Sequence, residues 1–199
     1  MRMMLTIGIT GNFGTGKTTV SKMLAELGAV AINADELGHE LYQPDSPAYS
    51  EVVAAFGKSI LKPDGEIDRQ KLGQLVFDDA SALARLNRIM HPRIYEIARQ
   101  KIEEYLEAGI KVVALEVALL IEAGWTPLVN QVWVTTAPET TIVKRLKSSR
   151  GLSEQQILTR LRSQMPQEEK SKRADVVINT DCPMDELKSK VAELWHNLP

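Results

Sequence analysis

Cysteine is almost absent from this sequence of 199 residues. Cys182 is the single cysteine, so no disulfide can form within the chain, and we expect a reducing, cytoplasmic location. Histidine is scarce as well, because the sequence holds three scattered histidines that form no pattern of transition-metal ligands with the one cysteine. The sequence therefore predicts neither a disulfide-stabilised domain nor a zinc-type centre.

Net charge and long apolar runs are also lacking. The formal net charge of -2 argues against a general binder of nucleic acids or membrane surfaces. The sequence does not reveal the oligomeric state, and a monomer is compatible with it. No apolar run reaches the roughly 18 residues that suggest a membrane span. The N-terminal run LTIGIT (5–10) leads straight into a glycine-rich loop, so we interpret it as a first strand and not as part of a signal peptide.

The segment GNFGTGKTTV, residues 11–20, fits the phosphate-binding pattern G-x-x-x-x-G-K-[ST]. In this pattern backbone N–H groups surround phosphate oxygens, Lys17 lies near the β- and γ-phosphates, and the Thr18 hydroxyl binds Mg²⁺. An apolar strand precedes the loop and an amphipathic helix follows it, as the pattern requires. The candidate ATP-binding residues here are Gly11, Gly14, Thr15, Gly16, Lys17, Thr18 and Thr19.

Five apolar runs of strand type alternate with helical segments, at residues 5–10, 29–35, 111–122, 131–136 and 175–179. This alternation predicts an α/β fold of three layers, in which helices cover both faces of a five-stranded parallel sheet. Together with the phosphate loop, it indicates a P-loop nucleoside triphosphate hydrolase-like fold.

Two long helical segments interrupt the core, which we place at about 1–35, 109–137 and 174–199. The first, at about 36–108, is a helical lobe with expected helices at 37–56, 71–77 and 81–90, and another from Pro92 to near Gly109. The second, at about 138–173, is called the lid below. Pro138 opens its first helix, and Ser153 with Gln156 forms a capping box for another.

Three acids are candidates for the chemistry. Asp35 ends the second run, and parallel sheets place their functional residues beyond the carboxyl ends of strands. There it would accept the proton of an attacking hydroxyl. The alternative is that Asp35 only caps the next helix. Glu116 interrupts an apolar run, where an unpaired acid is costly, so it serves either Mg²⁺ or the acceptor, or pairs with a cation of the lobe. Glu122 lies past the strand end and is a candidate substrate contact.

Cations gather in the lid, and Lys170 is one of them. They form either a solvated helix face or a cationic cover that neutralises charge as a phosphoryl group moves; Arg150 and Arg160 are the candidate ATP contacts. His91 joins two expected helices of the lobe and either packs there or contacts the substrate.

With these residues in view, the chain resembles the dephospho-coenzyme A kinase family from nearly end to end. The resemblance rests on the phosphate loop and on six further segments, which are NAD (33–35), IDRQKLGQLVF (67–77), LNRIMHPRI (86–94), LEVALLIEAG (115–124), RLRSQM (160–165) and ADVVIN (174–179). It implies that ATP phosphorylates the ribose 3′-hydroxyl of dephospho-coenzyme A, which is the last step of coenzyme A synthesis. It also implies that Gly14 to Thr19 carry the ATP phosphates, that Asp35 is the base and that the lobe receives the acceptor, while Arg160 and Gln164 match lid positions.

The sequence departs from the family pattern at several positions. Asn33 replaces the first Asp of D-A-D, Glu116 replaces an Asp, and Ala118 replaces a Pro. Ser149 stands where the family often has a lid arginine, for which Arg150 would substitute, and Thr180 replaces an Asn near the nucleotide base.

Other functions are compatible with the phosphate loop alone. A kinase of another nucleoside, nucleotide or small hydroxyl compound is the nearest alternative, and a panel of acceptors would distinguish it. An ATP-dependent switch without an acceptor is a second alternative, and would show slow hydrolysis that no acceptor stimulates. The D-E-L-G segment at 35–38 matches the D-x-x-G of GTPases, but the sequence has no N-K-x-D segment to read guanine.

Overall fold

The computed structural model describes residues 4–199, apart from the side chains at 77, 78 and 80. Residues 1–3, which the sequence analysis assigned to the core, lie outside the described residues. The chain divides into two compact units. The first runs up to Asn33 and resumes at Ile102, and the second is Ala34–Lys101.

The first unit is built on a five-stranded sheet whose neighbouring strands all pair in parallel. The strand order is β2-β3-β1-β4-β5, so β3 lies between β1 and β2. The strands are β1 (Leu5–Gly11), β2 (Val30–Asn33), β3 (Val112–Glu116), β4 (Gln131–Thr136) and β5 (Val176–Asn179). The predicted α/β fold with a five-stranded parallel sheet is therefore confirmed.

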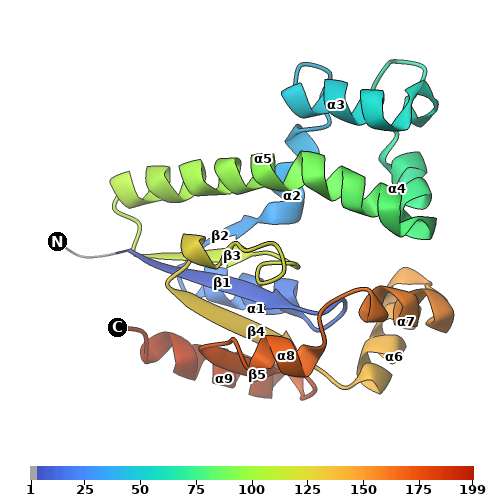
Figure 1. Cartoon of the computed structure of the whole chain (residues 1–199). Helices are drawn as coiled ribbons and strands as arrows, with labels where there is room; N and C mark the ends of the chain where they lie inside the picture. Colours follow the sequence, from blue (N-terminus) through green and yellow to red (C-terminus); the bar gives the residue numbers. More distant parts are fainter. Residues whose placement is uncertain (1–3) are drawn as a thin grey trace. The chain divides into compact units, whose positions relative to one another are not determined.

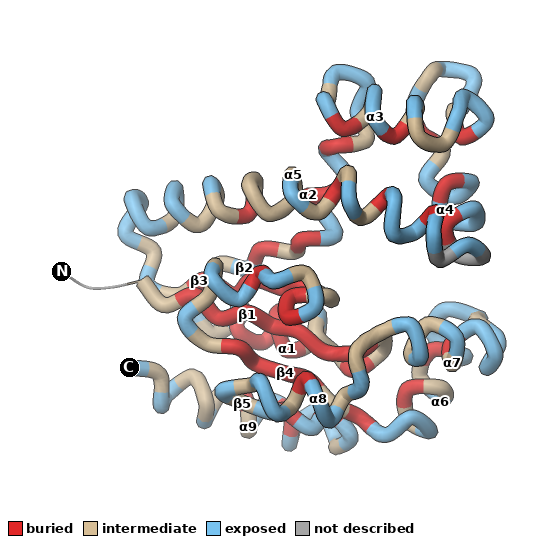
Figure 2. Tube along the Cα trace, viewed as in Figure 1, coloured by how far each residue is buried: buried red, intermediate tan, exposed pale blue. Residues whose placement is uncertain are grey.

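Helices α1 (Lys17–Glu26) and α9 (Met184–His196) contact each other on one face of the sheet (Figure 1). Their buried side chains pack on Ile7 and Ile9 of β1 and on Trp133 of β4. On the other face, a Cβ atom at Gly8 would meet Leu120 and Val129, so the segment that follows β3 covers β1 there. Figure 2 shows the central strands as the most continuously buried part of this unit, as expected for a sheet covered on both faces.

The lid contains α6 (Glu139–Arg150), α7 (Glu154–Arg162) and α8 (Gln167–Ser171). Pro138 precedes α6, and the capping box of Ser153 and Gln156 is present at the start of α7, as the sequence indicated. The lid has a small apolar cluster of its own. Its buried members are Ala137, Ile142, Leu146 and Ile157.

The second unit is helical. It contains α2 (Ala34–Glu40), α3 (Pro47–Phe56), the 3₁₀ helix η1 (Lys58–Ile60), α4 (Arg69–Asp78) and most of α5 (Ala80–Glu107). Ser46 caps α3 and Asp68 caps α4, each through side-chain acceptance of backbone N–H groups. Its apolar cluster includes Val52, Ile60, Leu72 and Met90.

Two predicted helix boundaries of this unit were wrong. The expected helix at 37–56 is two helices, because the chain turns after Glu40 and Ser46 starts α3 afresh with Pro47 at its first turn. The two helices expected on either side of Pro92 are one helix of 28 residues. Pro92 lacks the backbone N–H that would bond the Arg88 carbonyl, yet the helix continues through it. In the same turn, Arg93 Nη1 donates to the Ile89 carbonyl at 2.6 Å.

The strand expected at 111–122 is also shorter than predicted. β3 ends at Glu116, and the Val117 N–H still bonds the Ile9 carbonyl at 3.0 Å. The chain then leaves the sheet, and the Ala118 carbonyl accepts a hydrogen bond from the Thr10 side-chain hydroxyl. The sequence stays apolar beyond β3 because Leu120 is buried over the face of the sheet. An apolar run looks the same in the sequence whether it packs over a sheet or continues as a buried strand.

Candidate active site

The phosphate loop (residues 11–18) joins β1 to α1, and its backbone requires glycine at three places. Gly11, Gly14 and Gly16 have φ angles of 146°, 80° and 90°, which side-chain-bearing residues rarely adopt. At Gly11 a Cβ atom would also lie 2.5 Å from the Thr135 carbonyl oxygen. The loop is thus held close against β4, and α1 directs its positive N-terminal end at the space that the loop surrounds.

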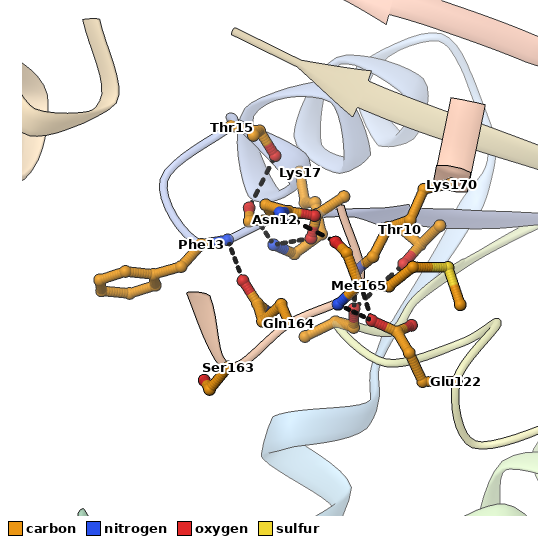
Figure 3. A network of polar contacts seen from close by, with 12 residues as sticks. Thr10, Asn12, Phe13, Thr15, Lys17, Glu122, Ser163, Gln164, Met165 and Lys170 are labelled. Atoms are coloured by element: carbon orange, nitrogen blue, oxygen red, sulfur yellow. Dashed lines mark hydrogen bonds and ion pairs between the residues drawn. The ribbon is translucent and has the colours of Figure 1, made fainter. Parts of the chain in front are cut away.

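Lys17 and Thr15 hold the loop together from within (Figure 3). Lys17 Nζ donates to the carbonyls of Gly11 at 3.0 Å and Asn12 at 3.1 Å. The Thr15 hydroxyl is buried, and lies 2.8 Å from both the Asn12 carbonyl and the Thr135 hydroxyl. These contacts place a lysine cation at the centre of the loop, and this arrangement fits the phosphates of a nucleoside triphosphate.

Thr18 and Glu116 place two oxygen ligands beside the loop. The Thr18 hydroxyl donates to Glu116 Oε1 at 2.6 Å, and Glu116 is only 7% exposed at the end of β3. Mg²⁺ prefers such hard oxygen ligands and usually completes its shell with phosphate oxygens and water. Among residues 4–199 no group of three His, Cys, Asp or Glu side chains could hold a metal ion by itself. Of the two readings for Glu116, this contact supports the one next to the triphosphate.

Asp35 lines a pocket of about 320 Å³ in the second unit. It is the second residue of α2 and is exposed, so it does not occupy the N-cap position that the alternative reading required. His91 of α5 and Arg69 of α4 also line the pocket, and an Arg69 guanidinium nitrogen contacts His39 Nε2. A carboxylate, a guanidinium and an imidazole thus face one apolar-walled space, which suits a small polar substrate.

Comparison with known proteins decides the family. The family model described as dephospho-CoA kinase matches residues 5–186. The chain belongs to the dephospho-CoA kinase family. A dephospho-CoA kinase of Dehalococcoides mccartyi is 46% identical over 185 residues, which cover 93% of each chain.

Solved structures agree with this kinase family. A crystal structure from Thermus thermophilus has a TM-score of 0.80 at 31% identity and covers 98% of both chains. A dephospho-CoA kinase from Campylobacter jejuni has a TM-score of 0.71 at 25% identity, over 98% of this chain and 96% of that one. Shikimate kinase from Acinetobacter baumannii, at 18% identity and a TM-score of 0.53, shares the fold alone.

The lid of this kinase contacts the tip of the phosphate loop. The Phe13 N–H donates to Gln164 Oε1 at 2.8 Å, and Asn12 Nδ2 donates to the Met165 carbonyl at 3.2 Å. The guanidiniums of Arg150 and Arg160 lie 5.2 Å and 5.1 Å from the centroid of the Phe13 ring. Both candidate arginines are thus brought to the phosphate loop, although the sequence pattern gave no reason to single out the variable position 13.

Lys170 is one of the cations of the lid, but it has neither of the two roles expected for them, because it is buried in an ion pair within the protein. Its side chain is 0% exposed, and Nζ forms an ion pair with Glu122 Oε1 at 2.8 Å and donates to the Ala118 carbonyl at 3.2 Å. The Met165 N–H approaches the same Glu122 oxygen at 3.4 Å. In Figure 3 the ion pair of Glu122 and Lys170 joins the segment after β3 to the end of the lid. Glu122 therefore has a structural role.

We expect Lys170→Met to lower the free energy of unfolding by about 3 kcal/mol, because the substitution leaves the Glu122 carboxylate, whose side chain is 20% exposed, without its cation. Urea denaturation of both proteins measures the difference. Lys172→Met, at an exposed position of the same segment, is the matched control and should change little. The double variant Lys170→Met, Glu122→Gln should recover part of the loss. A Lys170→Met protein as stable as the wild type would contradict this role.

Thr180, one of the departures from the family pattern, is buried and supports the phosphate loop. Its hydroxyl donates to the Thr15 carbonyl at 2.9 Å, and its Cγ2 lies 3.3 Å from a Cβ atom built at Gly16. Arg145 of the lid donates to the Thr180 hydroxyl at 3.0 Å and to its carbonyl at 2.7 Å. The departure therefore places a second threonine under the loop and ties α6 to it.

The other departures are accommodated locally. Ala118 uses its carbonyl, which proline also has, to accept from Thr10 and Lys170. Asn33 is the register partner of Glu116 between β2 and β3. Ser149 is exposed and donates to the Arg145 carbonyl at 2.8 Å, while its neighbour Arg150 makes the contact with the Phe13 ring.

His91 gives the second unit a pH-dependent stability. Burial lowers the pKa of this half-buried imidazole below its usual 6.5, and the Asp35 carboxylate opposes that shift more weakly. The unfolded chain therefore binds more protons as the pH falls below about 6.5, and the free energy of unfolding falls with it. We expect His91→Gln to flatten this dependence in urea denaturation at about pH 5.5 and pH 7.5. An equal pH dependence in both proteins would contradict the assignment.

Proposed function

We propose that this chain transfers the γ-phosphoryl group of ATP to the ribose 3′-hydroxyl of dephospho-coenzyme A, which yields coenzyme A and ADP. The observation that carries the proposal is the match to the dephospho-CoA kinase family over residues 5–186, which includes both the phosphate loop and the pocket of the second unit. The cytoplasm is the compartment we propose, because a chain with a single cysteine suits a reducing environment.

ATP is bound by the phosphate loop in this proposal. The backbone N–H groups from Gly14 to Thr19 and the α1 N-terminus contact the phosphates, and Lys17 exchanges its two carbonyl partners for phosphate oxygens. The Thr18 hydroxyl, with Glu116 beside it, would hold Mg²⁺, which neutralises phosphate charge when bound. Arg150 and Arg160 contact the triphosphate from the lid side.

The pocket of the second unit receives the ribose end of the acceptor. Asp35 faces this space and orients the attacking hydroxyl, while His91 and the Arg69 guanidinium contact the polar groups around it. In the transfer, the hydroxyl oxygen bonds the γ-phosphorus, the bond to the β–γ bridging oxygen breaks, and the hydroxyl proton passes to Asp35. ADP leaves with the bridging oxygen. Positioning and electrostatic stabilisation supply most of the catalysis.

The proposal is tested by ATP consumption with and without dephospho-coenzyme A, together with mass measurement of the acceptor. We expect strong stimulation of ATP consumption and a gain of one phosphoryl group on the acceptor. ATP binding without any stimulation would overturn the acceptor assignment. Shikimate and a set of nucleosides are the control acceptors, because the first is the substrate of a kinase that shares only the fold.

A further inference from the structure

Phe13 brings the two lid arginines together at the tip of the phosphate loop. Arg150 ends α6 and Arg160 lies in the last turn of α7, and each guanidinium lies within about 6 Å of the Phe13 ring centroid, the range of a cation–π contact. The two helices are joined through residues 151–153, so neither helix alone sets the distance between the two cations. The ring of Phe13 is the element that both cations share.

The position of the Phe13 ring is fixed by a backbone hydrogen bond and by apolar packing. Its backbone N–H donates to Gln164 Oε1 at 2.8 Å, and the ring packs against the apolar cluster of the lid, which includes Ile142, Leu146 and Ile157. In Figure 3 the ring points away from the hydrogen-bonded network of Thr10, Glu122 and Lys170. Phe13 thus belongs to the phosphate loop by its backbone and to the lid by its side chain.

Two like charges beside one ring favour a ligand of opposite charge. Partial burial and the nearby Arg150 both lower the pKa of Arg160, so keeping both guanidiniums charged in this place has a cost. A polyphosphate next to them would offset that cost, because its oxygens match the planar donors of arginine. The residues that surround phosphates in this chain begin one position away, at Gly14.

We propose that Phe13 is a positioning residue, whose ring face holds the guanidiniums of Arg150 and Arg160 in place to meet the triphosphate of ATP. This inference rests on the proposed function, because it takes ATP as the ligand of the loop. Residue 13 does not contact the reacting atoms. It acts on ATP through the two arginines, and its amide group is already bonded to Gln164.

The test is a thermodynamic cycle on ATP binding, measured by calorimetry with MgATP. Phe13→Leu keeps an apolar side chain but removes the π face, and we expect it to weaken ATP binding about tenfold. Phe13→Tyr keeps the ring and should stay within about twofold of the wild type. In the Arg150→Gln, Arg160→Gln background, the additional effect of Phe13→Leu should fall below about twofold, since the cations that the ring orients are gone.

A purely structural role for Phe13 predicts a different result. Phe13→Leu would then weaken ATP binding by the same factor in both backgrounds, and that result overturns the inference. A Phe13→Tyr protein that binds ATP as weakly as Phe13→Leu overturns it as well. Phe13→Met is measured in parallel as a second apolar variant, and thermal unfolding monitored by circular dichroism selects the folded proteins. Because the cycle reads ATP binding alone, a wild type that binds ATP but forms no coenzyme A would overturn the proposed function and leave the cycle intact.

Discussion

Lys17→Ala should remove most of the phosphoryl transfer, with a fall in kcat/KM on the order of a thousandfold, while the fold persists. Lys17 is the cation at the centre of the phosphate loop, and its Nζ contacts the carbonyls of Gly11 and Asn12 in the structure. In the reaction the same ammonium group stabilises charge that develops between the β- and γ-phosphates, and no other side chain of the loop carries a positive charge.

The stability of the Lys17→Ala protein should change by no more than about 1 kcal/mol, because the Asn12 carbonyl keeps its hydrogen bonds from the Thr15 hydroxyl and the Thr15 N–H. Coenzyme A formation and thermal unfolding are measured on the same preparations. Lys22→Ala is the matched control, since Lys22 is an exposed lysine of the same helix and should leave both quantities unchanged. Turnover near the wild-type level in Lys17→Ala would show that the phosphate-loop assignment is wrong.

The sheet could be predicted from the sequence because its strands are buried on both faces and form continuous apolar runs. Residues 131–136 were predicted as a strand with the same limits as β4. After Glu116 the apolar run packs over the sheet instead of within it. The sequence there gives no signal of where the strand ends. Pro92 was predicted to start a helix, but contacts of α5 with the apolar cluster of the second unit outweigh the lost backbone hydrogen bond.

The residues of the phosphate loop were predictable because their types are dictated by local geometry, as at Gly11, where any side chain would collide with β4. Phe13 and Lys170 act through tertiary contacts, and neither residue type nor spacing reveals them. Lys170 shows this most clearly, since a buried lysine and a solvated one are identical in sequence. Thr180 was noted only as a departure, and its support of the Thr15 carbonyl depends on β5 lying next to β4.

Asp35→Asn should lower kcat about a thousandfold and leave the affinity for ATP unchanged. Asparagine has nearly the same shape as aspartate but cannot accept the proton of the attacking hydroxyl, so the loss falls on the chemical step. Asp35 is exposed at the wall of the pocket, and its replacement should alter the free energy of unfolding by no more than about 0.5 kcal/mol. Single-turnover kinetics with saturating dephospho-coenzyme A, together with calorimetry for ATP, separate the two quantities.

Glu36→Gln provides the control for this substitution. Glu36 is the next residue of α2, is exposed, and lies in the same first turn, so its replacement removes an equal charge from the same helix end. Because Glu36 does not line the pocket, kcat should stay within about twofold of the wild type. If both variants lose activity equally, the loss comes from the charge near the start of α2, and Asp35 is not the base. If Asp35→Asn weakens ATP binding as much as it slows turnover, Asp35 is a binding residue and the base must be sought among the other groups that line the pocket.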